Sequence, residues 1–146
     1  MNTELKILLV EDNEGDIVLT MEALRKAKVT NHIQVIKDGE AALQYLRKQG
    51  PYSTAETPDL IFLDINLPKV DGKEVLANIK TDNALMLIPV VMFTTSDSEN
   101  DILYAYQHHV NCYITKPIDF DKFITSVQMI IDFWIKIVQL PRKKIV

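Results

Sequence analysis

The sequence predicts an α/β protein in which helices cover both faces of a five-stranded parallel sheet, a doubly wound three-layer sandwich. Three observations lead to this fold class. Strand and helix patterns alternate five times along the 146 residues. Four of the five strand patterns are short apolar runs rich in β-branched residues, which is typical of strands buried on both faces. Each of these four runs also ends in a chemically reactive side chain.

The four buried strands are expected at residues 6–10, 60–63, 90–93 and 112–115. In chain order, the groups that follow them are Glu11 with Asp12, then Asp64, Thr94 and Lys116. Since the carboxyl ends of parallel strands meet at one edge of the sheet, these groups should share a crevice. Three carboxylates, a hydroxyl and an ammonium would form an acid pocket able to hold a divalent cation beside an aspartate nucleophile.

The remaining elements complete a single domain. Residues 32–36 are more polar and end without a reactive group, so they are expected to form an edge strand. Apolar residues at helical spacing predict a helix after each strand. The first, second and fourth helices should end near Lys26, Lys48 and His108, and the last should begin at Asp119 or Phe120. The domain is expected to span residues 1–146, with a core over about 6–138 and a short tail over 139–146.

Composition excludes several classes of protein. A net charge of -4 argues against non-specific nucleic-acid binding, because there is no basic excess to displace counterions from phosphates. The most apolar stretch, residues 129–138, is interrupted by Asp132 and Lys136 and is too short to span a bilayer. The single cysteine, Cys112, rules out a disulfide framework. We therefore expect a cytoplasmic protein that binds neither nucleic acid nor a membrane.

The receiver domain of bacterial two-component response regulators carries similar groups at similar strand ends, here Glu11-Asp12, Asp64, Thr94 and Lys116-Pro117. The resemblance covers residues from about 6 to 138. It implies the flavodoxin-like strand order 2-1-3-4-5. Residues 63–69 and 109–116, the long loop around Pro51 and the extended last helix resemble single-domain regulators that partner bacterial phytochrome histidine kinases.

The resemblance also implies roles for individual residues. Asp64 would accept a phosphoryl group from a histidine kinase. Mg²⁺ would be bound directly by Asp12 and Asp64, through water by Glu11, and by the backbone carbonyl of Asn66. The compact charge of Lys116 would contact the phosphoryl oxygens.

Two further residues would form the switch. The hydroxyl of Thr94 would move toward the phosphoryl group and vacate space for Tyr113, the coupled aromatic residue. The Lys116-Pro117 peptide bond is expected to be cis by the same resemblance.

Other functions remain as alternatives at this stage. A receiver-fold adaptor that works without phosphorylation would keep the same fold. A haloacid-dehalogenase-like phosphatase also uses an aspartate after an apolar strand, but it places a second aspartate two residues later as general acid. Asn66 occupies that place and cannot transfer a proton. We therefore expect a phosphoacceptor and not a turnover enzyme.

The last helix suggests a partner surface. Its apolar residues span an arc of roughly 200°, against the ~100° or more that packing on a sheet requires. Burial of Phe133, Trp134 and Ile137 in a homodimer, through the face made by the fourth helix, the fifth strand and the last helix, would cover the excess. The alternatives are a kinase or downstream partner, or a tail that folds back at Leu140-Pro141. Pro141 leaves too few residues for a DNA-binding output domain, so signalling is expected to occur by protein contact.

Overall fold

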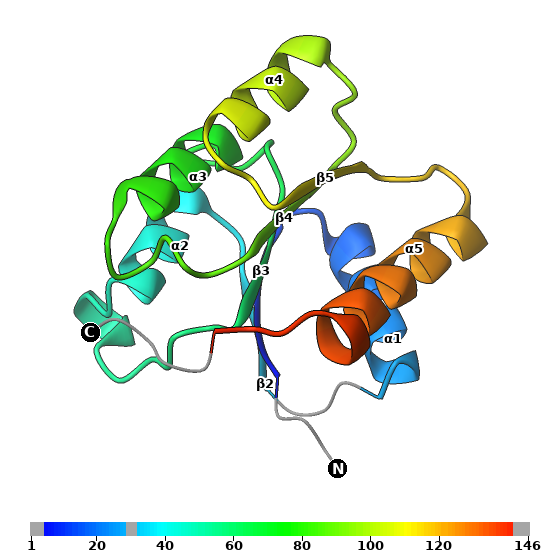
Figure 1. Cartoon of the computed structure of the whole chain (residues 1–146), viewed down its shortest axis with the longest axis horizontal. Coiled ribbons are helices and arrows are strands. Elements are labelled where there is room, and N and C mark those ends of the chain that lie inside the picture. Colours follow the sequence, from blue (N-terminus) through cyan, green and yellow to red (C-terminus); the bar gives the residue numbers. More distant parts are fainter. Residues whose placement is uncertain (1–4, 29–31, 142–146) are drawn as a thin grey trace.

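The computed structural model describes residues 5–28 and 32–141. Its sheet has five parallel strands in the order β2-β1-β3-β4-β5, as predicted (Figure 1). The strands are β1 (Lys6–Val10), β2 (His32–Ile36), β3 (Leu60–Leu63), β4 (Val90–Thr94) and β5 (Cys112–Thr115). The α-helices are α1 (Glu14–Lys26), α2 (Gly39–Leu46), α3 (Gly72–Thr81), α4 (Glu99–Gln107) and α5 (Phe120–Asp132).

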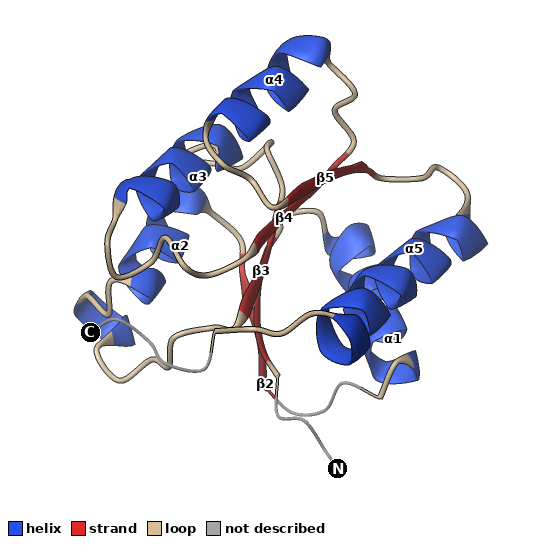
Figure 2. Ribbon diagram, viewed as in Figure 1, coloured by secondary structure: helices blue, strands red, loops and turns tan. Residues whose placement is uncertain are grey.

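Helices cover both faces of the sheet and form the outer layers of a sandwich. Helices α2, α3 and α4 lie on one face, and α1 and α5 lie on the other (Figure 2). Because successive strand side chains point to opposite faces, the sheet has a hydrophobic core on each side. Leu8 and Met92 belong to the first core, beneath α2, α3 and α4, whereas Leu9 and Phe93 belong to the second core, beneath α1 and α5. The strand β2 is an edge strand with alternating exposure, as its polar sequence predicts.

A side-chain cap fixes the start of each helix. The carboxylate, amide or hydroxyl oxygen of the residue before the helix accepts a hydrogen bond from a backbone N–H in the first turn. These capping residues are Asn13, Asp38, Asp71, Ser98 and Asp119. In parallel strand–helix units the helix starts and the carboxyl ends of the strands lie at the same edge of the sheet, so the first turns of the helices lie on the side of the molecule that carries the reactive side chains.

The start of α3 packs directly against the backbone at the end of β3. A Cβ atom placed on Gly72 would lie 1.9 Å from the carbonyl oxygen of Asp64, and the amide of Gly72 donates a hydrogen bond to the carbonyl of Ile65 at 2.8 Å. Only glycine permits this approach. The position of α3 therefore helps to fix the backbone that carries Asp64.

The carboxyl-terminal part of the chain differs from the expected continuous helix. The α-helix α5 ends at Asp132 and passes into a π-helix, Phe133–Ile137. The wider turn directs Trp134 into the core, where 9% of it remains exposed, while Phe133 and Ile137 stay on the surface. The prediction that Trp134 would be buried at a dimer interface is therefore wrong, since the protein's own second core already covers it.

The expected tail over residues 139–146 is only partly visible. Leu140 is half-buried against the second core, which agrees with the alternative of a tail that folds back. The basic cluster Arg142-Lys143-Lys144 lies outside the described residues. Within the described ranges, no helix is long and apolar enough to cross a membrane. These ranges also contain no cis peptide bond, so the cis prediction for Lys116-Pro117 is wrong, and the bond adopts the trans form that even X–Pro bonds favour.

Candidate phosphoryl-transfer site

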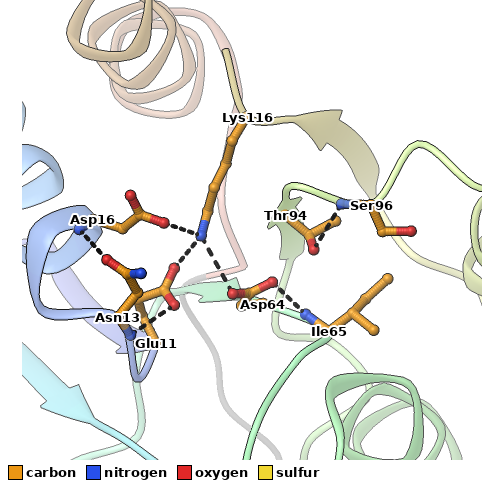
Figure 3. A network of polar contacts seen from close by, with 8 residues as sticks. All are labelled: Glu11, Asn13, Asp16, Asp64, Ile65, Thr94, Ser96 and Lys116. Carbon is orange, nitrogen blue, oxygen red and sulfur yellow. Dashed lines mark hydrogen bonds and ion pairs between the residues drawn. The ribbon is translucent and has the colours of Figure 1, made fainter. Parts of the chain in front are cut away.

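Four strand ends bring the sequence-predicted groups together. Glu11 follows β1, Asp64 follows β3, Thr94 ends β4 and Lys116 follows β5 (Figure 3). The parallel register explains the convergence, because Val10 pairs with Leu63 and Thr94 pairs with Thr115. The backbone N–H of Lys116 also donates to the carbonyl of Thr94 at 2.7 Å.

The ammonium of Lys116 is the centre of the polar network. It is buried and forms an ion pair with the carboxylate of Glu11. It lies 2.8 Å from Oδ2 of Asp16 and 3.3 Å from Oδ2 of Asp64. The second carboxylate oxygen of Asp64 accepts a hydrogen bond from the backbone N–H of Ile65 at 2.7 Å, which fixes the orientation of the carboxylate.

Burial and the surrounding charges shift the pKa values of Glu11 and Lys116 in this site. Desolvation by burial, together with the nearby charge of Asp64, raises the pKa of Glu11 to about 7, although Lys116 opposes the rise. Burial disfavours the charged form of Lys116, but hydrogen bonds with Asp16 and Glu11 outweigh it and raise the pKa of Lys116. Repulsion between neighbouring carboxylates is the condition that a bound cation relieves.

Three carboxylates are placed to bind a metal ion together. One oxygen from each of Glu11, Asp12 and Asp64 lies within 4.8 Å of the others. Glu11 and Asp64 are buried, whereas Asp12 is exposed and opens the group to solvent. An all-oxygen, anionic donor set of this kind suits a hard divalent cation. Asn66 is exposed in the turn after Asp64, and its part as a ligand stays a prediction.

The loop after β4 links Thr94 to Tyr113. Thr94 is fully buried, and its hydroxyl oxygen is 3.4 Å from the backbone nitrogen of Ser96. The hydroxyl of Tyr113 donates to the carbonyl of Ser96 at 2.8 Å. The side chain of Ser96 in turn donates to Asp101 of α4 at 2.6 Å. One residue of this loop therefore connects the end of β4 with both β5 and α4.

The sequence reasoning missed two residues of this network. Asp16 contacts Lys116, and Ser96 contacts Tyr113 and Asp101, but neither residue is among the candidate site residues predicted from the sequence. A signal for Asp16 was available, because it lies in the first turn of the helix that follows the acidic pair. No sequence signal marks Ser96, since its contacts with Thr94 and Tyr113 use backbone atoms.

Comparison with known proteins supports the family. The family model of the response regulator receiver domain matches residues 7–128. The chain is 45% identical to the response regulator Rcp1 of Synechocystis sp. over 135 residues, which covers 92% of each protein. These matches, together with the fold and the acid pocket, show that the chain belongs to the response regulator receiver family.

Solved structures narrow the relationship to regulators of phytochrome signalling. The crystal structure of the phosphorylated cyanobacterial phytochrome response regulator RcpA superposes with a TM-score of 0.92 at 48% identity, and the match covers 95% of this chain and 99% of RcpA. The Mn²⁺-bound form of Rcp1 superposes with a TM-score of 0.90 at 44% identity, covering 94% of this chain and 99% of that one. The chain is thus a homologue of single-domain phytochrome response regulators.

Proposed function

We propose that this receiver domain is a phosphorylation-dependent switch in which Asp64 accepts the phosphoryl group from a histidine kinase. The observation that carries the proposal is the position of the Asp64 carboxylate, buried at a strand end between the N–H of Ile65 and the ammonium of Lys116. A carboxylate oxygen attacks phosphorus, the bond to the donor breaks, and an acyl phosphate forms on Asp64. The domain is thus a phosphoacceptor and not a turnover enzyme.

The metal in this proposal is Mg²⁺, bound directly by Asp12 and Asp64, with Glu11 acting through water and the backbone carbonyl of Asn66 completing the set. A divalent cation at these oxygens neutralises negative charge on the transferred group. The proximity of the three carboxylates and the Mn²⁺-bound relative support this assignment. Mg²⁺ is favoured because it prefers oxygen ligands and keeps several of its waters when one or two carboxylates bind it.

Two side chains contact the phosphoryl oxygens: Thr94 at the end of β4 and Lys116 directly after β5. Lys116 already lies beside Asp64 and supplies a point charge. Thr94 donates its hydroxyl, and the movement of Thr94 pulls on the Ser96 loop to which Tyr113 is bonded. Tyr113 then reports the state of Asp64 to the surface formed by α4, β5 and α5.

The partners are a histidine kinase and a second copy of the chain. A phytochrome-type kinase is favoured because RcpA is described as a phytochrome response regulator. The homodimer would form through the α4-β5-α5 face, without nucleic acid or membrane. A switch that takes its phosphoryl group from a histidine kinase and binds Mg²⁺ would work in the cytoplasm, which is the location we propose.

The test is phosphorylation by acetyl phosphate with Mg²⁺, measured as a mass increase of one phosphoryl group per chain. Asp64→Asn removes the nucleophile with almost no change in volume and is expected to abolish the increase. The matched control is Asp97→Asn, which removes an exposed carboxylate from the loop after β4 and is expected to label like wild type. Mg²⁺-dependent labelling of Asp64→Asn at the wild-type level would refute the assignment.

A further inference from the structure

Asp16 forms a contact that neither phosphoacceptor chemistry nor metal binding explains. Its carboxylate lies 2.8 Å from the ammonium of Lys116, closer than the 3.3 Å that separates Lys116 from Asp64. Yet Asp16 is not one of the three acids whose oxygens converge as metal donors. Figure 3 shows the Asp16 side chain directed from α1 toward Lys116, while Asp64 approaches the same ammonium from β3.

The first turn of α1 holds Asp16 in this position. Its backbone N–H donates to the side chain of the capping residue Asn13 at 2.9 Å, and the N–H of Asn13 is 3.2 Å from a carboxylate oxygen of Glu11. The Asp16 side chain is 24% exposed. Glu14 belongs to the same helical turn, but it is 70% exposed and pairs with Lys37 outside the crevice. The turn therefore presents one acid to the site and another to solvent.

The contact between Asp16 and Lys116 affects how the site binds a phosphoryl group. The ammonium has three protons to donate, and the carboxylates of Glu11, Asp16 and Asp64 already engage it. A phosphoryl group on Asp64 must compete with these acceptors for the same protons. Stabilisation of the helix dipole would account for an acidic residue in this turn, but it would not account for the direction of the Asp16 side chain toward Lys116.

We propose that Asp16 is a positioning residue for Lys116, which holds the ammonium in the unphosphorylated protein and competes with the phosphoryl oxygens for it. The inference rests on the proposed function, since it assigns Lys116 to the phosphoryl group. Asp16 thereby lowers the affinity of the site for a phosphoryl group, so that less of the protein carries one.

The test compares binding of beryllofluoride, a tetrahedral mimic of the acyl phosphate, at saturating Mg²⁺ by titration calorimetry. Asp16→Asn keeps the shape of the side chain and removes its charge, and it is expected to bind the mimic about three- to tenfold more tightly, the range set by a partly buried ion pair. Asp16→Ser is a second uncharged variant. Glu14→Gln removes the same charge from the same helical turn and is expected to bind like wild type.

Two further measurements separate positioning from a general field effect. The gain of Asp16→Asn should persist in 0.5 M salt, because screening removes long-range interactions but not a contact pair. The ¹⁵N signal of the Lys116 ammonium in the metal-free protein should shift in Asp16→Asn and stay in place in Glu14→Gln. A wild type that binds no beryllofluoride would overturn the proposed function. A wild type that binds it, with equal or weaker binding in both Asp16 variants, would overturn the role of Asp16 alone.

Discussion

Single residues set the geometry of this site, and Gly72 is the one that most directly constrains the phosphoacceptor. The Gly72→Ala substitution would place a methyl group 1.9 Å from the carbonyl oxygen of Asp64. Because the obstacle is backbone, the start of α3 and the Asp64 loop must separate. We expect a loss of about 1–3 kcal/mol in the free energy of unfolding, measured by urea denaturation, together with slower labelling by acetyl phosphate.

The control for this substitution is Gly15→Ala, also in the first turn of a helix. A Cβ atom there would meet only the side-chain oxygen of Asn13, at 3.3 Å. Because that oxygen belongs to a side chain that can shift by a few tenths of an ångström, we expect the stability to stay within about 0.5 kcal/mol of wild type, as for most surface positions. Equal destabilisation of the two variants would contradict the claim that α3 positions Asp64.

Asp12 is the acid whose removal should separate metal binding from folding. It is exposed, so Asp12→Ala leaves no cavity, yet it deletes one of three converging donors. Millimolar Mg²⁺ should raise the melting temperature of wild type, because a ligand that binds only the folded state stabilises it. Relative to the metal-free melting temperature of each variant, the increase should be mostly lost in Asp12→Ala and retained in Asp97→Ala, which removes an exposed carboxylate outside the metal-binding group. A wild-type melting temperature that does not respond to Mg²⁺ would contradict the metal site.

At the scale of elements, Lys80 connects α3 to the start of the two strands β4 and β5. Its ammonium donates to the carbonyls of Met86 and Ile88 at 3.2 and 2.9 Å, and to the side chain of Asn111 at 3.0 Å. The same side-chain oxygen of Asn111 accepts from the N–H of Val90 at 2.8 Å. These three partners are two carbonyls and a side-chain amide, with no carboxylate among them, and burial lowers the pKa of Lys80 to about 8.

This lowered pKa predicts how stability depends on pH. Between pH 8 and pH 10.5 the unfolded chain holds a proton on Lys80 that the folded protein has lost, so the contribution of Lys80 to stability rises with pH and is lost as pH falls through 8. Lys80→Met has similar length and no charge. The free energy of unfolding of wild type relative to Lys80→Met should therefore increase by about 1–2 kcal/mol from pH 7.5 to pH 10, after allowance for partial exposure.

Urea denaturation of both proteins at both pH values measures this difference. Tyrosine ionisation at pH 10 affects wild type and Lys80→Met alike, so it cancels in the comparison. Lys136→Met, which removes an exposed lysine paired with Asp132, should show no such increase. A difference between wild type and Lys80→Met that is constant with pH would mean that Lys80 is solvated in the folded state.

Elements were more predictable from the sequence than contacts between them. Strand runs and capping residues determine the fold locally, and parallel pairing then carries Glu11, Asp64, Thr94 and Lys116 to one edge. The roles of Asp16 and Lys80 depend on side-chain directions across elements, which hydrophobic spacing does not encode. The π-helix at residues 133–137 likewise escaped prediction, because a helical wheel assumes 3.6 residues per turn throughout.

At the scale of the whole molecule, the apolar surface that stays exposed is where the proposed homodimer would form. The helices α4 and α5 lie on either side of the edge strand β5 (Figure 1), and α4, α5 and the π-helix carry exposed apolar side chains. These residues are Leu103, Tyr106, Met129, Phe133 and Ile137. Leu140 covers part of the second core, yet Phe133 and Ile137 remain 47% and 70% exposed. Self-association would bury this surface, whereas Trp134 is already packed in the second core beneath it.

The substitution Phe133→Asp tests that interface without disturbing the core. Full burial of a Phe side chain contributes about 1.5–3 kcal/mol, part of which is offset by the entropy lost on association. We expect Phe133→Asp to weaken dimerisation at least tenfold in sedimentation equilibrium. Val18→Asp, which places the same charge at a 65% exposed position of α1, should dimerise like wild type.

Phosphorylation should act on the same equilibrium, because the hydrogen bond from Tyr113 to Ser96 joins the loop after Thr94 to the strand at the centre of this face. A coupling of about 1–3 kcal/mol between site and interface would change the dimer affinity of wild type by roughly 5- to 150-fold on treatment with acetyl phosphate and Mg²⁺. Tyr113→Phe keeps the ring and removes the hydrogen bond, so it should reduce this change while leaving the dimer affinity of the unphosphorylated protein nearly intact. If wild type stays monomeric at millimolar concentration in both states, the exposed face of α5 is reserved for a different partner and the homodimer is refuted.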